Sequence, residues 1–104
     1  MANSCTNTLY ASTRGCKLRD SLTELIQNIF GSKELHKFDN GEVFECKIEF
    51  ESRWRFPREE MEKLMQEFPD DNDFYIHVVS YEFGCEYVGF NIYSLGEWRD
   101  KFVD

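Results

Sequence analysis

Two histidines are the residues of this chain best suited to acid-base chemistry near neutral pH. His36 stands beside Lys37 before a predicted turn, and His77 lies in a strand-like segment rich in tyrosine. Neither has a serine, cysteine or carboxylate at a spacing that marks a known catalytic site. We therefore assign no catalytic residue. An enzyme that combines His77 with a tyrosine and a carboxylate from a neighbouring strand is one hypothesis, and a partly exposed sheet histidine is the simpler interpretation.

The four cysteines do not form a metal-binding pattern. They include no C-x-x-C pair and have no histidine at zinc-ligand spacing. The sequence contains neither the apolar segment of a signal peptide nor an apolar run long enough to cross a membrane, so we expect reduced, mostly buried thiols in a cytoplasmic protein. Neither a metal nor a cofactor is expected. The cysteines are Cys5, Cys16, Cys46 and Cys85.

Acidic residues are concentrated in two segments of a chain whose formal net charge is -8. Segment 57–73 holds seven acidic and two basic residues, and segment 39–51 holds five and one. These residues are either ordinary solvated faces or an acidic surface that binds a basic partner, in imitation of the phosphates of DNA. Calcium is only weakly indicated, because the aspartates lack the glycine and glutamate of an EF-hand loop. The acidic surface would comprise Glu59, Glu60, Glu62, Glu67, Asp70, Asp71 and Asp73.

Tyrosines alternate with other residues along segments 74–83 and 87–93. Successive side chains of a strand point to opposite faces, so each segment should carry its tyrosines on one face. We expect both sets to share one open face, which is either a protein-binding surface or a set of cross-strand pairs covered by the tail. The absence of lysine and arginine from these segments argues against stacking of RNA bases. The residues assigned to this face are Tyr75, His77, Tyr81, Tyr87, Tyr93 and Trp98.

A small α+β domain must position these side chains. The length of 104 residues and the hydrophobic fraction of 41% indicate a single folded domain, 1–104. Apolar spacing predicts helices over 18–30 and 57–68, and alternation predicts strands over 6–13, 35–39, 42–51, 74–83 and 87–93. Asn40-Gly41 predicts a type I′ hairpin. The order β-α-β-β-α-β-β is the ferredoxin-like split β-α-β arrangement with one added strand, in which two helices cover one face of an antiparallel sheet.

Three stretches resemble a known family. Similarity to the YubB-like ferredoxin-like domain proteins of phages and conjugative plasmids is found in the opening Met1-Ala2-Asn3-Ser4-Cys5-Thr6-Asn7-Thr8-Leu9, in the stretch Ile48 to Pro57, and in Phe68-Pro69 followed by Tyr81 to Gly84 and Gly89. Those proteins typically begin Met-x-Asn-Trp-Cys-x-Asn, whereas Ser4 replaces the tryptophan here, and their middle insertion with a Trp-Gly-x-x-Trp motif is missing. The resemblance implies a ferredoxin-like fold and a mobile-element origin. It implies no activity, because the family has no known function.

These observations predict a small acidic protein-binding domain of phage or plasmid type. In its most concrete form it inhibits a host nucleic-acid-handling or defence system by binding a host protein with a basic surface. We expect no direct binding to nucleic acid or to a membrane. The alternatives are a self-associating structural module, whose open face or edge strand pairs with a second copy, and the small enzyme that uses His77.

Overall fold

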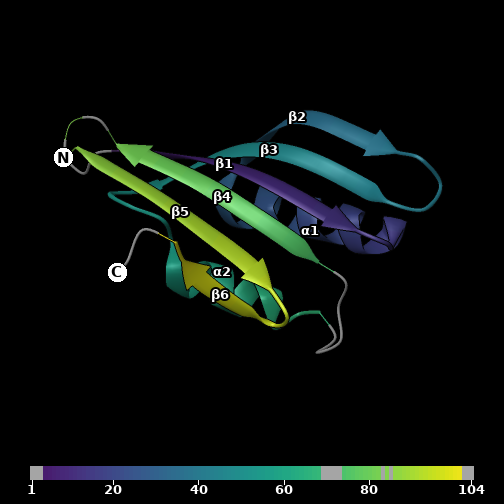
Figure 1. Ribbon diagram of the computed structural model, residues 1–104. Coiled ribbons are helices and arrows are strands. Elements are labelled where there is room, and N and C mark those ends of the chain that lie inside the picture. The colour runs from purple at the N-terminus through teal and green to yellow at the C-terminus, as the bar shows by residue number, and fades with distance from the viewer. Residues whose placement is uncertain (1–3, 69–73, 83, 85, 102–104) are drawn as a thin grey trace.

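The computed structural model describes residues 4–68, 74–82, 84 and 86–101, which form one six-stranded antiparallel sheet and two helices (Figure 1). The predicted α+β class is confirmed. The sheet has one strand more than expected, because part of the C-terminal tail pairs with the preceding strand. The elements are β1 (Ser4–Thr13), α1 (Cys16–Phe30), β2 (Ser32–Asp39), β3 (Phe44–Arg53), α2 (Arg58–Met65), β4 (Tyr75–Glu82), β5 (Tyr87–Ser94) and β6 (Glu97–Asp100).

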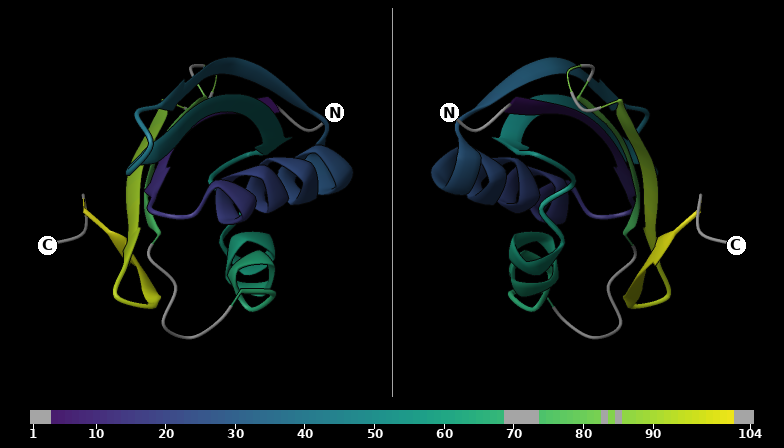
Figure 2. Two further views of the ribbon diagram at one scale, coloured as in Figure 1. Left: turned by 90° about the vertical axis from the view of Figure 1, so that its right-hand side faces the viewer. Right: turned by 90° about the vertical axis from the view of Figure 1, so that its left-hand side faces the viewer.

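The strand order is β2-β3-β1-β4-β5-β6. Helix α1 connects β1 to β2, and β3 lies between these two strands in the sheet. Helix α2 connects β3 to β4, and β1 lies between those two strands. Two β-α-β units are therefore interleaved. Both helices lie on the concave side of the curved sheet, and neither covers the convex side (Figure 2).

The hydrophobic core lies between the helices and the concave face of the sheet. Leu9 and Ala11 of β1 point into it, as the sequence pattern predicts, and Cys46 of β3 does so as well. Ile29 is spaced to continue the buried stripe of Leu22 and Ile26 on α1, but it is half exposed, because it lies at the end of the helix beside a surface hollow. Other core residues are Leu22, Ile26, Ile48, Phe50, Met61, Leu64, Met65, Phe68, Ile76 and Val78.

The hairpin between β2 and β3 forms, but its turn is not the predicted type I′. The loop has four residues, 40–43, and the only positive φ in it is that of Gly41, at 89°. Asn40 closes the loop with its side chain, whose Oδ1 accepts hydrogen bonds from the backbone N–H groups of Glu42 and Val43. A two-residue turn with two positive φ values joins β5 to β6 instead, at Leu95 and Gly96.

No helix among the described residues is both long and apolar enough to cross a lipid bilayer.

Candidate functional site

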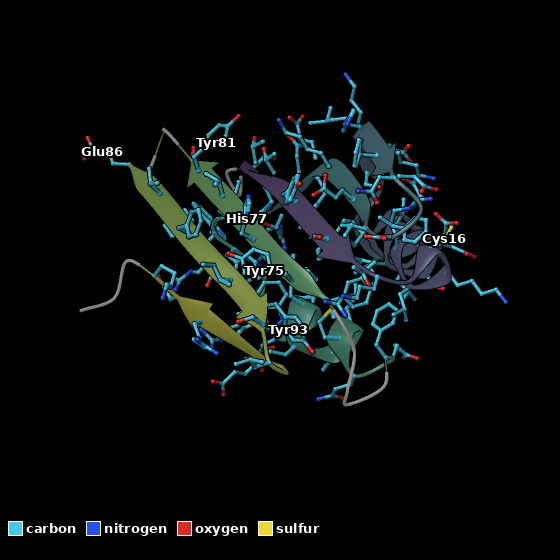
Figure 3. All side chains as sticks on the ribbon, turned by 45° about the vertical axis from the view of Figure 1, so that its right-hand side comes forward. Cys16, Tyr75, His77, Tyr81, Glu86 and Tyr93 are labelled. Atoms are coloured by element: carbon cyan, nitrogen blue, oxygen red, sulfur yellow. The ribbon has the colours of Figure 1, made fainter. Side chains whose placement is uncertain are left out.

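A stack of aromatic rings from three strands lies on the convex face of the sheet, which we call the open face. Tyr10 of β1 stacks on His77 of β4, with 5.0 Å between ring centroids and 13° between ring planes. His77 stacks in turn on Phe90 of β5, at 5.7 Å and 18°. Tyr75 meets His77 edge-on at 6.3 Å. We call Tyr10, Tyr75, His77 and Phe90 the ring ladder; Figure 3 shows Tyr75, His77 and Tyr81 along β4.

Apolar side chains continue the ring ladder along β4 and β5. The register places Val79 opposite Phe90, and Tyr81 opposite Val88, on the same face. Tyr75 is 45% exposed and Val88 is 55% exposed, so these groups meet solvent although they are large and apolar. Contiguous exposed apolar surface on a soluble domain commonly marks an interaction site, so this face is the candidate site.

Charged side chains border the ring ladder on both sides. On β3, Glu45, Glu49 and Glu51 lie opposite the open-face residues of β1, and we call these three the acidic row. Lys47 interrupts the row opposite Tyr10, and Arg53 follows the row opposite Ser4. On the other side, Arg99 of β6 lies opposite Ile92 of β5. The open face therefore has an apolar centre, a mainly acidic flank on β3 and a basic group on β6.

His77 and Tyr10 of the ring ladder are uncharged at neutral pH. Burial disfavours the imidazolium and lowers the pKa of His77 below its ordinary value of 6.5. A hydrogen bond to the Glu45 carboxylate, together with desolvation, raises the pKa of Tyr10 to about 12. The ladder thus presents neutral aromatic surface to a partner.

Tyr87, Tyr93 and Trp98 do not belong to the open face, so the prediction of one tyrosine face across both strands is wrong. The register pairs Ser80 with Gly89 and Ile76 with Tyr93, which puts the odd-numbered residues of β5 on the helix side. Tyr93 and Trp98 are only 4% and 6% exposed. The hydroxyl of Tyr87 accepts a hydrogen bond from the Phe56 N–H on the same side, at 3.3 Å.

The predicted acidic surface is on the opposite side of the molecule from the ring ladder. Glu59, Glu60 and Glu62 are exposed on α2, and Glu67 is exposed just after it. Since α2 lies on the concave side, these carboxylates cannot share one flat interface with Tyr75 and His77 (Figure 2). The remaining predicted members, Asp70, Asp71 and Asp73, lie outside the described residues.

Sequence reasoning missed Tyr10, Phe90 and the acidic row as members of the site. A signal for Tyr10 was present: it lies between the apolar residues Leu9 and Ala11 in a predicted strand, and when those two are buried the residue between them points to the other face. The acidic row was visible as alternation along β3, but only the strand pairing shows that it lies beside aromatic rings.

The geometry gives no support to catalysis by His77. Its described neighbours on the open face are the rings of Tyr10, Tyr75 and Phe90 and the aliphatic Ile92, and no carboxylate among the described residues is hydrogen-bonded to its imidazole. The described part of the chain also contains no group of three histidine, cysteine or acidic side chains that could hold a metal ion.

The described cysteines do not contribute to the site. Cys5, Cys16 and Cys46 are free thiols, and burial raises the pKa of Cys5 and of Cys46. Both buried sulfurs therefore stay protonated and unreactive at neutral pH. Cys16 begins α1, well away from Tyr75 and His77 (Figure 3). Cys85 lies outside the described residues.

Comparisons of this chain with protein-family models, with curated proteins and with solved structures found no match. The candidate site is therefore argued from its residues and geometry.

Proposed function

We propose that this protein is a binding module that contacts another protein through the open face of its sheet. The observation that carries the proposal is the ring ladder, in which Tyr10, His77 and Phe90 stack at 5.0 and 5.7 Å on a face that neither helix covers. Aromatic side chains supply most of the energetic hot spots of protein interfaces. Because these rings are held on paired strands, little conformational entropy is lost when a partner covers them.

The acidic row indicates the charge of the partner. Glu45, Glu49 and Glu51 lie along β3 beside the ring ladder, and the whole chain has a net charge of -8. Phosphates would be repelled by this flank, which argues against direct binding of nucleic acid. A protein surface with an apolar centre and a basic edge is complementary to the open face. Host proteins that handle nucleic acids carry such basic surfaces, and inhibition of one of them is the role we predict.

Self-association through a strand edge is a weaker alternative. β2 is an eight-residue edge strand, but a bulge between Glu34 and His36 and the charges of Lys33 and Lys37 interrupt it. The opposite edge, β6, has only four residues, three of them charged. Bulges, charges and short length are the features by which sheets resist edge-to-edge pairing. A second copy would more readily pair through the open face.

We also propose that the fold belongs to the ferredoxin-like class with two added strands. The order β2-β3-β1-β4 of the inner strands and the two helices on one side support this assignment, and β5 and β6 would then extend the sheet beyond β4. The phage or plasmid origin implied by the family resemblance stays a prediction, as does a cytoplasmic location.

The proposed function is tested with two variants on opposite sides of the molecule. Val79→Arg combined with Val88→Arg adds charge to the centre of the open face, at exposed positions that the fold tolerates. Glu59→Lys combined with Glu60→Lys and Glu62→Lys reverses the charge of α2 on the far side. First, the tagged wild-type protein is used to capture its partner from bacterial lysate at low and high salt, and mass spectrometry identifies the captured partner. Calorimetry on the purified proteins then measures the Kd of wild type and of each variant for that partner.

We expect the open-face variant to weaken the affinity at least about tenfold and the α2 variant to leave it nearly unchanged, since one buried hot spot contributes about 2 kcal/mol or more. The reverse result would move the site to α2 and overturn the proposal. Light scattering at several concentrations addresses self-association: a wild-type dimer that becomes monomeric in the open-face variant would identify the partner as a second copy.

A further inference from the structure

A hollow of about 630 Å³ opens on the helix side of the molecule, away from the ring ladder. It lies between the last turn of α1, the residues that follow β3, and the first turn of α2. Its apolar wall includes Phe30 and Phe56, and three arginines, Arg53, Arg55 and Arg58, also line it. This volume is within the range of sites that bind small molecules, about 300 to 1,000 Å³.

A tight turn at the end of β3 places Arg53 and Arg55 at the rim of the hollow. The Arg55 N–H donates to the Arg53 carbonyl at 2.7 Å, and Trp54 between them has a φ of 70°. Both residues flank this three-residue turn, and both line the hollow. Trp54 does not line it and is 47% exposed.

Buried polar groups hold this turn in place. The Ser52 hydroxyl donates to the Arg55 carbonyl at 2.6 Å and accepts a hydrogen bond from Asn7 Nδ2 at 2.9 Å. Asn7 has no exposed surface, and its Oδ1 accepts a hydrogen bond from the Ser80 hydroxyl at 2.6 Å. The backbone of the turn that carries Arg53 and Arg55 is thus fixed to β1, β3 and β4, so both arginines start from a fixed position at the rim of the hollow.

Arg53 and Arg55 are not neutralised by the described part of the protein. Arg58 is occupied, since its guanidinium bonds to Glu62 at 2.9 Å and to the Trp98 carbonyl at 3.3 Å. Neither Arg53 nor Arg55 has a carboxylate of the described residues within ion-pair distance. Their N–H donors are therefore available to a ligand at the rim of the hollow, and a guanidinium matches the oxygens of a carboxylate or phosphate in two parallel hydrogen bonds.

Three carboxylates limit which anions this hollow can hold. Glu51, Glu59 and Glu60 also line it, so its formal charge is balanced by three arginines and three glutamates. An anion without an apolar part gains little electrostatic energy in a site whose positive and negative charges balance, so its binding needs further favourable contacts. The apolar wall can supply them by burying hydrocarbon surface, at about 25 cal/mol per Å².

We propose that the hollow binds a small organic anion in which a phosphate or carboxylate group is attached to an apolar body. Arg53 and Arg55 bind the oxygen atoms, and Phe30 and Phe56 contact the apolar body. This site shares Glu51 with the acidic row but includes no residue of the ring ladder, and it does not depend on the function proposed for the open face.

The test is an amide ¹H-¹⁵N NMR titration with phenyl phosphate as the probe. We expect saturable shifts confined to residues 29–30 and 51–60, with a millimolar Kd, and at least tenfold weaker binding of inorganic phosphate and of phenol. Arg53→Gln combined with Arg55→Gln should weaken the binding of phenyl phosphate at least tenfold, because charge-assisted hydrogen bonds are lost. Arg53→Gln alone should give an intermediate loss.

Arg14→Gln combined with Lys17→Gln is the matched control, since it removes two exposed positive charges near the opposite end of α1. It should leave the Kd unchanged, as should the open-face variant Val79→Arg/Val88→Arg. The proposal is overturned if phenyl phosphate up to about 10 mM gives no saturable shifts at these residues. It is equally overturned if the paired arginine variant binds as well as wild type, or if inorganic phosphate or phenol binds as well as phenyl phosphate.

Discussion

His77 couples the proton equilibrium of an imidazole to the stability of the fold. Its ring is stacked between Tyr10 and Phe90, and burial lowers its pKa below the ordinary 6.5. The unfolded chain therefore binds a proton at a higher pH than the folded protein does. Consequently the free energy of unfolding should have its full His77 contribution above pH of about 6.5 and lose it as the pH falls through the folded pKa.

A phenylalanine at this position should remove that dependence. His77→Phe keeps a ring in the stack but cannot take up a proton, so its urea midpoint should fall less than that of wild type between pH of about 7.5 and 5. The measurement is urea unfolding at a series of pH values. His36→Gln, which removes the exposed imidazole on β2, is the control. Identical pH slopes for wild type and His77→Phe would contradict this reading of the ring ladder.

Leu95 occupies a backbone conformation that suits asparagine or glycine. It has a φ of 53° in the two-residue turn between β5 and β6, and it is 92% exposed, so its side chain gains nothing from packing. Leu95→Asn should raise the free energy of unfolding by about 1 kcal/mol, because asparagine tolerates the left-handed region. Thermal unfolding measures the change. Leu95→Ala is the control and should give no comparable gain; equal gains would show that the backbone is not strained here.

At the scale of elements, strand existence was readable from the sequence, whereas the pairing of faces between strands was not. Alternation correctly separated Tyr75 and His77 from Ile76 within β4. The length of the loop between β4 and β5 determines which side chains of the two strands share a face. Because Glu82 pairs with Tyr87, this loop has four residues. One residue more or less would have moved Tyr93 to the open face. The register of β5 against β4, which that loop sets, therefore determines which tyrosines lie on the open face.

The helices and the core were predictable for a different reason. The spacing of Leu22 and Ile26, and of Met61, Leu64 and Met65, fixes one buried face whatever the strands do. The hollow beside Arg53 and Arg55 was not predictable, because residues from α1, β3 and α2 line it and its turn depends on a buried asparagine far away in sequence. Sites that several elements share become visible only once the elements are packed.

Asn7 links three strands through its side chain, so the stability of the end of the sheet where these strands meet should depend on it. Its amide donates to Ser52 and accepts from Ser80, in a position with no solvent exposure. Asn7→Ala leaves both hydroxyls without this partner and should lower the free energy of unfolding by about 2 to 4 kcal/mol. Thr8→Ala, one residue along β1 on the open face, is the matched control and should cost less than about 1 kcal/mol. Urea unfolding compares the two; similar losses would refute the network's role.

The molecule as a whole has a candidate site on each side of its core. The open face carries the ring ladder and the acidic row, and the helix side carries the hollow and the exposed glutamates of α2. A rigid sheet lies between them, so a partner on one side leaves the other side accessible. Substitutions can then be assigned to a side: those on the open face should alter partner binding, and those in the layer between should alter stability.

The two tryptophans give the sharpest test of this division. Trp98 is 6% exposed and joins β6 to the rest of the molecule, with its ring 5.3 Å from those of Phe56 and Tyr93. Trp98→Ala should therefore lower the free energy of unfolding by about 3 to 5 kcal/mol. Trp54→Ala removes a half-exposed ring and should cost less than about 1 kcal/mol, which urea unfolding of both variants measures. Had Trp98 been part of a partner surface, as its sequence context indicated, its loss would weaken binding and leave stability nearly unchanged. That outcome would place β6 away from the core and contradict the six-stranded sheet.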